Sequence, residues 1–254
     1  MIQPMRTALA RAAAALLMLA AAASAAPAQA PEPGFLAQRP DIRVWLPPAP
    51  PPGSLAQAED ETIYLHTRAL LDTPRGAEAA ADNVYLPEAV APRFAEALGA
   101  TLNPKDTPRT LALIGRVVKD AEALVAPVKQ SPPPKGAGRV RPFVAFGGKT
   151  CPLTPDDYKF HLPETGSYPS THAALGWIWA SVLTALAPDR ADRLIARGIA
   201  FGDSRVVCGF HFKSDVEAGR LAAAALMARE AADPGFEAAL AAAKRELDAY
   251  RARR

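Results

Sequence analysis

Three features of the sequence predict an all-α fold. Apolar residues recur three and four positions apart in successive stretches along most of the chain. Proline, glycine and short polar clusters separate these stretches, as they commonly separate helices. No stretch shows the two-residue alternation of a half-buried strand, and no repeat with a fixed period is found.

The first expected helices lie in the N-terminal half. Residues 54–71 carry apolar side chains at mixed three- and four-residue spacings, and the break at Pro74 ends that stretch. Residues 87–98 form a short amphipathic stretch that ends before a glycine. A third helix is expected from Pro108, which suits a first turn, to about Val125.

The C-terminal half predicts four more helices. Residues 169–186 are apolar on most sides, so we expect this helix to be central and buried. Residues 190–201 form the next helix. Residues 213–231 are rich in alanine, which favours close packing on a neighbour, and residues 236–250 form a last amphipathic helix after the break at Asp233-Pro234-Gly235.

Residues 1–25 have the features of a signal peptide. Arg6 and Arg11 precede or begin an apolar run over 12–23, and Ala23-Ser24-Ala25 is a small-residue cleavage pattern. The run is shorter than the roughly 20 residues that span a bilayer, and no positive stop follows it, so a retained anchor is the weaker reading. We expect a periplasmic or secreted protein without a membrane segment after cleavage.

The rest of the chain is divided into an arm and one domain. Residues 26–55 are rich in proline and alanine, and the prolines within 47–52 should run extended over the surface. Residues 56–254 form the helical domain, with a loop expected over 147–168. The formal net charge of +3 gives no reason to expect nucleic-acid binding.

The chain has two cysteines, Cys151 and Cys208. An even pair in an oxidising compartment favours a disulfide. Two buried free thiols are the alternative, which the sequence leaves open.

Three segments concentrate cationic and histidine side chains. The first contains Lys135, Arg139 and Arg141, the second covers residues 166–172, and the third covers residues 204–215. Free N–H groups at a helix start, such as the one expected near residue 169, suit a bound anion. Arginine adds a planar fork of donors for phosphate oxygens.

His211 and Asp215 are four residues apart. If a helix begins there, they lie on one face and can touch. A carboxylate that accepts from one ring nitrogen fixes the tautomer and leaves the other nitrogen free as a nucleophile. Such a pair alone is more often an ordinary surface contact, and the three segments gain weight only together and in this order.

The segments resemble the signature of the phosphatidic-acid-phosphatase type 2 (PAP2) and vanadium haloperoxidase superfamily. That signature is Lys-x6-Arg-Pro, then Pro-Ser-Gly-His, then Ser-Arg-x5-His-x3-Asp. The chain contains Arg141-Pro142, Pro169-Ser170-Thr171-His172, and Ser204-Arg205 followed at the same spacing by His211 and Asp215. The likeness is greatest to class A bacterial non-specific acid phosphatases, and it covers essentially the whole chain after the signal. It implies a single-domain helical bundle of the PAP2/haloperoxidase type.

The resemblance also implies roles for individual residues. His211 attacks phosphorus and becomes phosphohistidine, Asp215 orients it, and His172 serves as general acid and then general base. The phosphate is held by Arg141, Arg205, Ser170, Thr171 and a lysine. Small phosphomonoesters are the implied substrates, with no cofactor and no metal; a homo-oligomer is left open.

The chain departs from the signature at two points. Thr171 stands where the family has glycine, and a β-branched residue restricts the backbone and narrows the pocket. Lys135 leaves five residues before Arg141 instead of six, and Lys129 is the other candidate if residues 131–134 are an insertion. We favour Lys135.

The departure at Thr171 and the shared anion site keep other functions open. A vanadate-dependent haloperoxidase would use the same anion site. A lipid phosphatase is disfavoured by the lack of spanning segments. A periplasmic phosphate-binding protein that has lost activity through Thr171 is the reading without catalysis.

Overall fold

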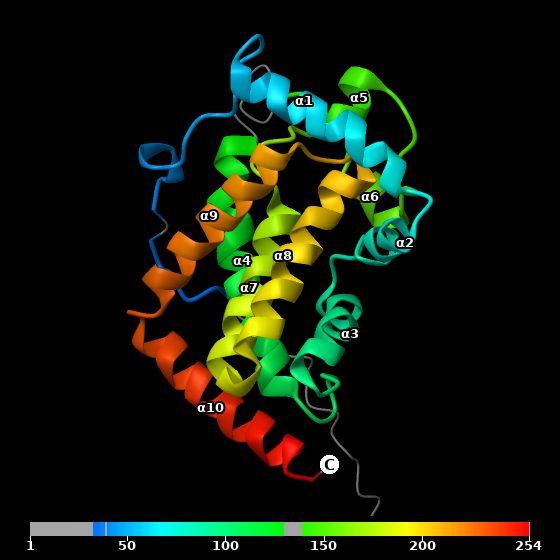
Figure 1. Ribbon diagram of the computed structural model, residues 1–254. Helices are drawn as coiled ribbons and strands as arrows, with labels where there is room; N and C mark the ends of the chain where they lie inside the picture. Colours follow the sequence, from blue (N-terminus) through cyan, green and yellow to red (C-terminus); the bar gives the residue numbers. More distant parts are fainter. Residues whose placement is uncertain (1–32, 39, 130–138, 254) are drawn as a thin grey trace, which may run out of the picture. The chain divides into compact units, whose positions relative to one another are not determined.

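The computed structural model describes residues 33–38, 40–129 and 139–253, and within these ranges it contains helices and no strand (Figure 1). The predicted all-α class is therefore confirmed. The expected signal peptide and Lys135 lie outside the described residues. The α-helices are α1 (Leu55–Thr67), α2 (Pro74–Ala81), α3 (Pro87–Leu98), α4 (Pro108–Lys129), α5 (Pro142–Phe146), α6 (Pro155–Lys159), α7 (Thr171–Leu186), α8 (Ala191–Cys208), α9 (Lys213–Glu230) and α10 (Pro234–Arg251). Short 3₁₀ turns cover Ile42–Val44, Arg68–Leu70 and Pro188–Arg190.

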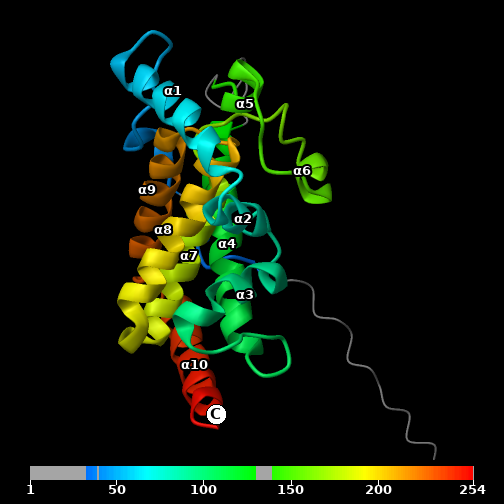
Figure 2. The ribbon, with the colours of Figure 1, turned by 45° about the vertical axis from the view of Figure 1, so that its right-hand side comes forward.

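Helix α7 is the centre of the core. It packs against α8, α9 and α4, and both views show it between these helices (Figures 1 and 2). Ile178, Trp179 and Leu183 are fully buried, and Trp179 stacks on Phe94 of α3 with ring centroids 5.7 Å apart. A helix that is apolar on most sides must be covered on most sides, so the sequence prediction for this segment is confirmed.

Helix α8 runs seven residues beyond its predicted end at Phe201, to Cys208. Its last two turns carry the buried polar residues Ser204 and Arg205, whose partners lie elsewhere in the chain, so periodicity alone did not show the extension. The helix ends at Gly209, whose φ of 83° suits glycine. Arg68 donates to the terminal carbonyls of Val206 (2.7 Å) and Val207 (2.8 Å).

Helices α2, α5 and α6 were not expected from the sequence. Each begins with a proline at its first position. The sequence predicts a break at Pro74 and a loop over 147–168, and no element is expected over residues 142–146. Proline ends a preceding helix but fits the first turn of the next, where no N–H is needed. Thr73 and Thr154 cap α2 and α6 with side-chain hydrogen bonds to the main chain.

The described part of the arm packs onto the helices. Phe35, Ile42 and Leu46 are buried in the main core. The Phe35 N–H donates to Asp120 of α4 at 2.5 Å, and the Tyr168 hydroxyl donates to the Pro47 carbonyl. Within the described ranges, none of the helices combines the length and the apolar character needed to cross a membrane.

Candidate active site

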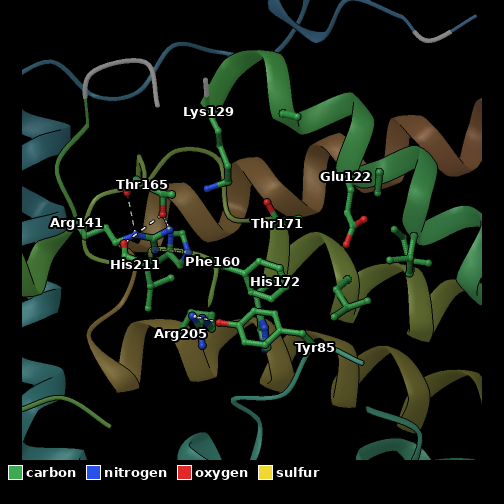
Figure 3. A pocket seen from close by; sticks show the side chains of 16 residues that line it. Tyr85, Glu122, Lys129, Arg141, Phe160, Thr165, Thr171, His172, Arg205 and His211 are labelled. Atoms are coloured by element: carbon green, nitrogen blue, oxygen red, sulfur yellow. Dashed lines mark hydrogen bonds between the residues drawn. The ribbon is translucent and has the colours of Figure 1, made fainter. Parts of the chain in front are cut away.

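A cavity of about 360 Å³ brings the sequence-predicted segments together (Figure 3). Helices α4 and α7 form two of its walls, and the end of α8 and the loops around α5 and α9 complete it. Five of the predicted site residues line it together with one further lysine: Lys129, Arg141, Thr171, His172, Arg205 and His211. Both histidines therefore face one shared cavity.

His211 lies in the short connection between α8 and α9. Asp215 is the third residue of α9 and accepts from the Phe212 N–H at 2.8 Å, so it caps the start of that helix. Its Oδ2 lies 3.4 Å from His211 Nδ1. The two residues thus meet at a helix start, with His211 before the helix, and not on one face of a helix as the spacing suggested.

Asp215 is held by a buried polar network. Ser167 donates its hydroxyl to Asp215, and Arg139 donates to the other carboxylate oxygen at 2.7 Å. The same guanidinium pairs with Asp60 of α1 at 2.6 Å and donates to Ser214 at 2.5 Å. All of these carboxylates and the arginine are less than 8% exposed. The position of Asp215 is therefore fixed by contacts from three separate segments.

The remaining ring nitrogen of His211 faces the cavity. Its Nε2 lies 2.9 Å from Nη1 of Arg141, a group that can only donate. Nε2 is therefore the acceptor, and the proton of a neutral ring is on Nδ1, toward Asp215. Burial, followed by the charges of Arg141 and Lys129, holds the pKa of His211 well below its usual range. This is the neutral form that a nucleophile requires.

Two arginines line the cavity, and hydrogen bonds to neighbouring residues hold each of them. Arg141 donates to the carbonyls of Phe210 (2.9 Å) and Thr165 (3.1 Å), and burial lowers its pKa to about 10, which leaves it charged. Arg205 donates to Asn83 and to the Tyr85 hydroxyl (2.9 Å). Arg205 also pairs with the buried carboxylate of Asp157 at 3.9 Å. Two guanidinium groups that line the same cavity suit an anionic ligand.

His172 is in the first turn of α7 and is held by rings. It stacks on Phe201 of α8 with centroids 4.4 Å apart and meets the edge of Tyr85 at 5.2 Å. Neither ring nitrogen makes a hydrogen bond with a described residue, although the nearby Asp82 carbonyl acts to raise its pKa. Burial, with Arg205 and His211 next, nevertheless holds the pKa of His172 well below its usual range.

Ser170 and Thr171 begin α7. The Ser170 side chain accepts from the Ala173 N–H at 3.2 Å, and the Ser170 N–H donates to the Asp215 carbonyl at 2.9 Å. Ser170 caps the helix and does not line the cavity, whereas Thr171 does. A Cβ at Gly219 of α9 would lie 2.2 Å from the Ser170 carbonyl, so only glycine lets α9 approach this turn.

Lys129 is the lysine that the structure brings to the cavity. It is the last residue of α4, and its ammonium group donates to the carbonyls of Gly166 (3.1 Å) and Ser167 (3.4 Å). Burial, and then Arg141, hold its pKa well below its usual range. Lys135, which the spacing favours, lies outside the described residues, so its place remains a prediction.

A disulfide joins Cys151 and Cys208, which agrees with the prediction from their even number. It ties the segment before α6 to the last residue of α8. This bond joins two residues 57 positions apart, and the loop that it closes contains Thr165, His172 and Arg205. It therefore links the segment before α6 covalently to the end of α8, the helix that carries Arg205.

Several supporting residues carry no signal in the sequence. Arg139 stands in the first cationic segment but had no assigned partner. Asp60 lies far from the motifs along the chain, Asp157 lies between two of them without belonging to either, and Tyr85 has no pattern to mark it. Asp157 accepts from Tyr85 at 2.6 Å, and Tyr85 in turn contacts Arg205. Among the described residues, no three His, Cys, Asp or Glu side chains converge as metal ligands do.

Comparison with known proteins gives the same assignment from independent sequences. The sequence model of the PAP2 superfamily matches residues 128–232. The non-specific acid phosphatases of Providencia stuartii and Salmonella typhimurium are each 37% identical to this chain, over 83% and 80% of its length and 82% and 79% of theirs. The acid phosphatase of Zymomonas mobilis is 33% identical over 83% of this chain and 77% of its own. The chain therefore belongs to the PAP2 superfamily and, within it, to the family of bacterial non-specific acid phosphatases.

Proposed function

We propose that the protein is an exported acid phosphatase that hydrolyses small organic phosphomonoesters through a phosphohistidine at His211. One observation carries the proposal. His211 has one ring nitrogen toward a buried carboxylate and the other in a cavity that it shares with His172, Arg141 and Arg205. The names of its relatives support the activity.

In the first step, Nε2 of His211 attacks phosphorus and the bond from phosphorus to the ester oxygen breaks. Arg141 now donates to Nε2, and it would turn to a phosphate oxygen when the ester enters. The Nδ1 proton stays toward Asp215, which stabilises the cationic ring as it forms. Because Asp215 is fixed by Arg139 and Ser167, the ring needs little reorganisation.

The leaving oxygen receives a proton from His172. The pKa values of both histidines are lowered in the free protein, so neither ring holds a proton ready for this step. A phosphomonoester whose second proton, with a pKa of about 6, is still bound supplies it. The bound phosphate charge raises the pKa of His172, which takes the proton and passes it to the leaving group. This gives a physical reason for activity at acid pH.

The second step returns the enzyme to its starting state. His172, neutral after the first step, accepts a proton from water as the oxygen attacks phosphorus. The bond from phosphorus to Nε2 breaks, His172 passes the proton it took from water to the departing phosphate, and the monoanion of inorganic phosphate leaves with both rings neutral again. No redox partner or cofactor takes part in either step.

The phosphate oxygens carry the developing charge, which two arginines would stabilise together with a lysine whose lowered pKa the bound phosphate raises. Arg141 is held by the Phe210 carbonyl, and Arg205 is held by Asn83. We assign the lysine position to Lys129, because its ammonium group donates to the Gly166 carbonyl, next to the Thr165 carbonyl that holds Arg141. The N–H groups at the start of α7 add donors, since the first turn of a helix leaves them without partners in the helix. The Thr171 side chain narrows this end of the cavity.

The intermediate provides the direct test of this mechanism. The wild-type protein is mixed with a radiolabelled monoester, quenched within milliseconds in alkali, and analysed for acid-labile, alkali-stable label. We expect label on the wild type and on His66→Ala, whose histidine is exposed on α1, and none on His211→Ala. Turnover without any phosphoenzyme would contradict the mechanism. Phosphate binding without turnover would instead favour an inactive binding protein.

A further inference from the structure

The cavity extends beyond the phosphate site as an apolar groove between α4 and α7. Leu175 and Ile178 of α7 line it, opposite Val118 and Ala126 of α4. Leu175 and Ile178 follow His172 at three-residue steps, so they form one helix face that leads away from the histidine. The alcohol part of a bound ester leaves the phosphate site in this direction.

One carboxylate lines this groove. Glu122 lies seven residues before Lys129 on α4, which places the two on the same face about 10 Å apart along the axis. Figure 3 shows Lys129 turned toward Arg141 and His211, and Glu122 turned into the pocket farther along the helix. The groove therefore has a cationic end, apolar walls and an acidic group at a distance from the cations.

The surroundings of Glu122 favour a charged partner. Residue Glu122 is exposed at the pocket mouth, but neighbouring atoms still desolvate its carboxyl and raise its pKa, against the effect of Lys119. A partly desolvated carboxylate gains more from a cation or a donor than one in bulk water does. The same carboxylate repels a second negative charge on the substrate.

We propose that Glu122 makes this enzyme selective for phosphomonoesters whose alcohol part is apolar and ends in a cationic or hydrogen-bond-donor group. The proposal rests on the phosphatase activity proposed above and adds the substrate class. Glu122 is a specificity residue and takes no part in the chemistry. Its interaction is the same in the bound ester and in the transition state, so it acts on KM and leaves kcat unchanged.

Three aryl phosphates with closely similar leaving groups test the proposal. Tyramine phosphate carries an ammonium tail, para-propylphenyl phosphate a neutral tail, and para-carboxyethylphenyl phosphate an anionic tail. At near-neutral pH, we expect kcat/KM of the wild type to fall in that order, by about three- to fivefold at each step, as a partly exposed ion pair allows. The differences should lie in KM.

Two variants and one control isolate the carboxylate. Glu122→Gln should bring the three values within about twofold of one another, and Glu122→Lys should reverse their order. Glu96→Gln, which removes an exposed carboxylate of α3 outside the cavity, should keep the wild-type order.

The outcomes separate this proposal from the proposed function. Equal kcat/KM values in the wild type, or an order that persists in Glu122→Gln, would overturn the role of Glu122 and leave the phosphatase assignment intact. Failure to hydrolyse any of the three esters, at acid as well as near-neutral pH, would overturn the phosphatase assignment itself.

Discussion

His211 is held by charged and polar side chains, whereas His172 is held by aromatic rings. Asp215 and Ser167 each have an oxygen 3.4 Å from Nδ1 of His211, and Arg141 lies 2.9 Å from its Nε2. His172 lies between Phe201 and Tyr85, and its nitrogens have no hydrogen bond with a described residue. One ring is fixed in tautomer and direction, and the other is fixed in position and plane but not in tautomer.

The difference matches what the two proposed roles need. A nucleophile must present one nitrogen, so a carboxylate on the other nitrogen is useful. In a group that gives and then takes a proton, neither protonation state should be strongly stabilised, so a permanent hydrogen-bond partner would hinder it. Stacking fixes the plane of His172 without fixing its protonation state.

The largest effect is expected at the carboxylate that orients His211. Asp215→Asn keeps the size of the side chain and an acceptor for the Phe212 N–H, but it no longer stabilises a cationic ring. By analogy with orienting aspartates in other nucleophilic sites, kcat should fall about 10⁴-fold. Steady-state kinetics with a monoester measure it, and Asp248→Asn on the surface of α10 is the control. A loss below tenfold would show that Asp215 does not orient the nucleophile.

Arg139 should matter most for stability. It pairs with Asp60 and Asp215, and its removal leaves two buried carboxylates without their cation. Arg139→Met should lower the free energy of unfolding by about 3–5 kcal/mol. The exposed pair of Arg43 with Asp41 offers a matched control, for which the loss should stay below about 1 kcal/mol.

Urea denaturation of both variants gives the comparison. Arg139→Lys should recover part of the loss, because it restores one charge but not the two-sided fork. Equal losses for Arg139→Met and Arg43→Met would mean that the network around His211 adds no rigidity. The surroundings of His211 and His172 would then differ in composition but not in rigidity.

The sequence predicted the parts of the site that are close together in the chain. Arg205, His211 and Asp215 keep the spacing of a known signature, and the structure brings the first two to one cavity, with Asp215 behind His211. Their supports were not predictable in this way. Arg139 is 79 residues from Asp60, and Tyr85 is 72 residues from Asp157, so only folding makes them neighbours.

The fold shows the same division between local and distant information. The periodicity of residues 87–98 gave α3 with its observed bounds, because its apolar face is written in the local sequence. The end of α8 was placed seven residues too early, since its last turns carry polar groups that find partners in other segments. Lys129, at the end of α4, reaches the cavity, although the spacing before Arg141 favours Lys135.

A smaller effect, which depends on the substrate, is expected at His172. His172→Asn should lower kcat by about 10²-fold for an alkyl ester, whose leaving oxygen needs a proton. For para-nitrophenyl phosphate, whose leaving group is stable as an anion, the loss in the first step should be much smaller. Single-turnover kinetics with the two esters measure this difference. Equal losses for both esters would place the function of His172 elsewhere than at the leaving oxygen.

The smallest expected effect is a displacement of the pH profile. Both histidines of the free protein have pKa values below their usual range, so just below neutral pH both rings are neutral and the ester brings the proton. The alkaline limb of kcat/KM should then follow the second pKa of the ester, near about 6, and move to lower pH for an ester with a more acidic phosphate. An alkyl phosphate and an aryl phosphate measured on the same preparation test this. A limb that stays at one pH for both esters would belong to a protein group, and His172 would then hold its own proton before the substrate arrives.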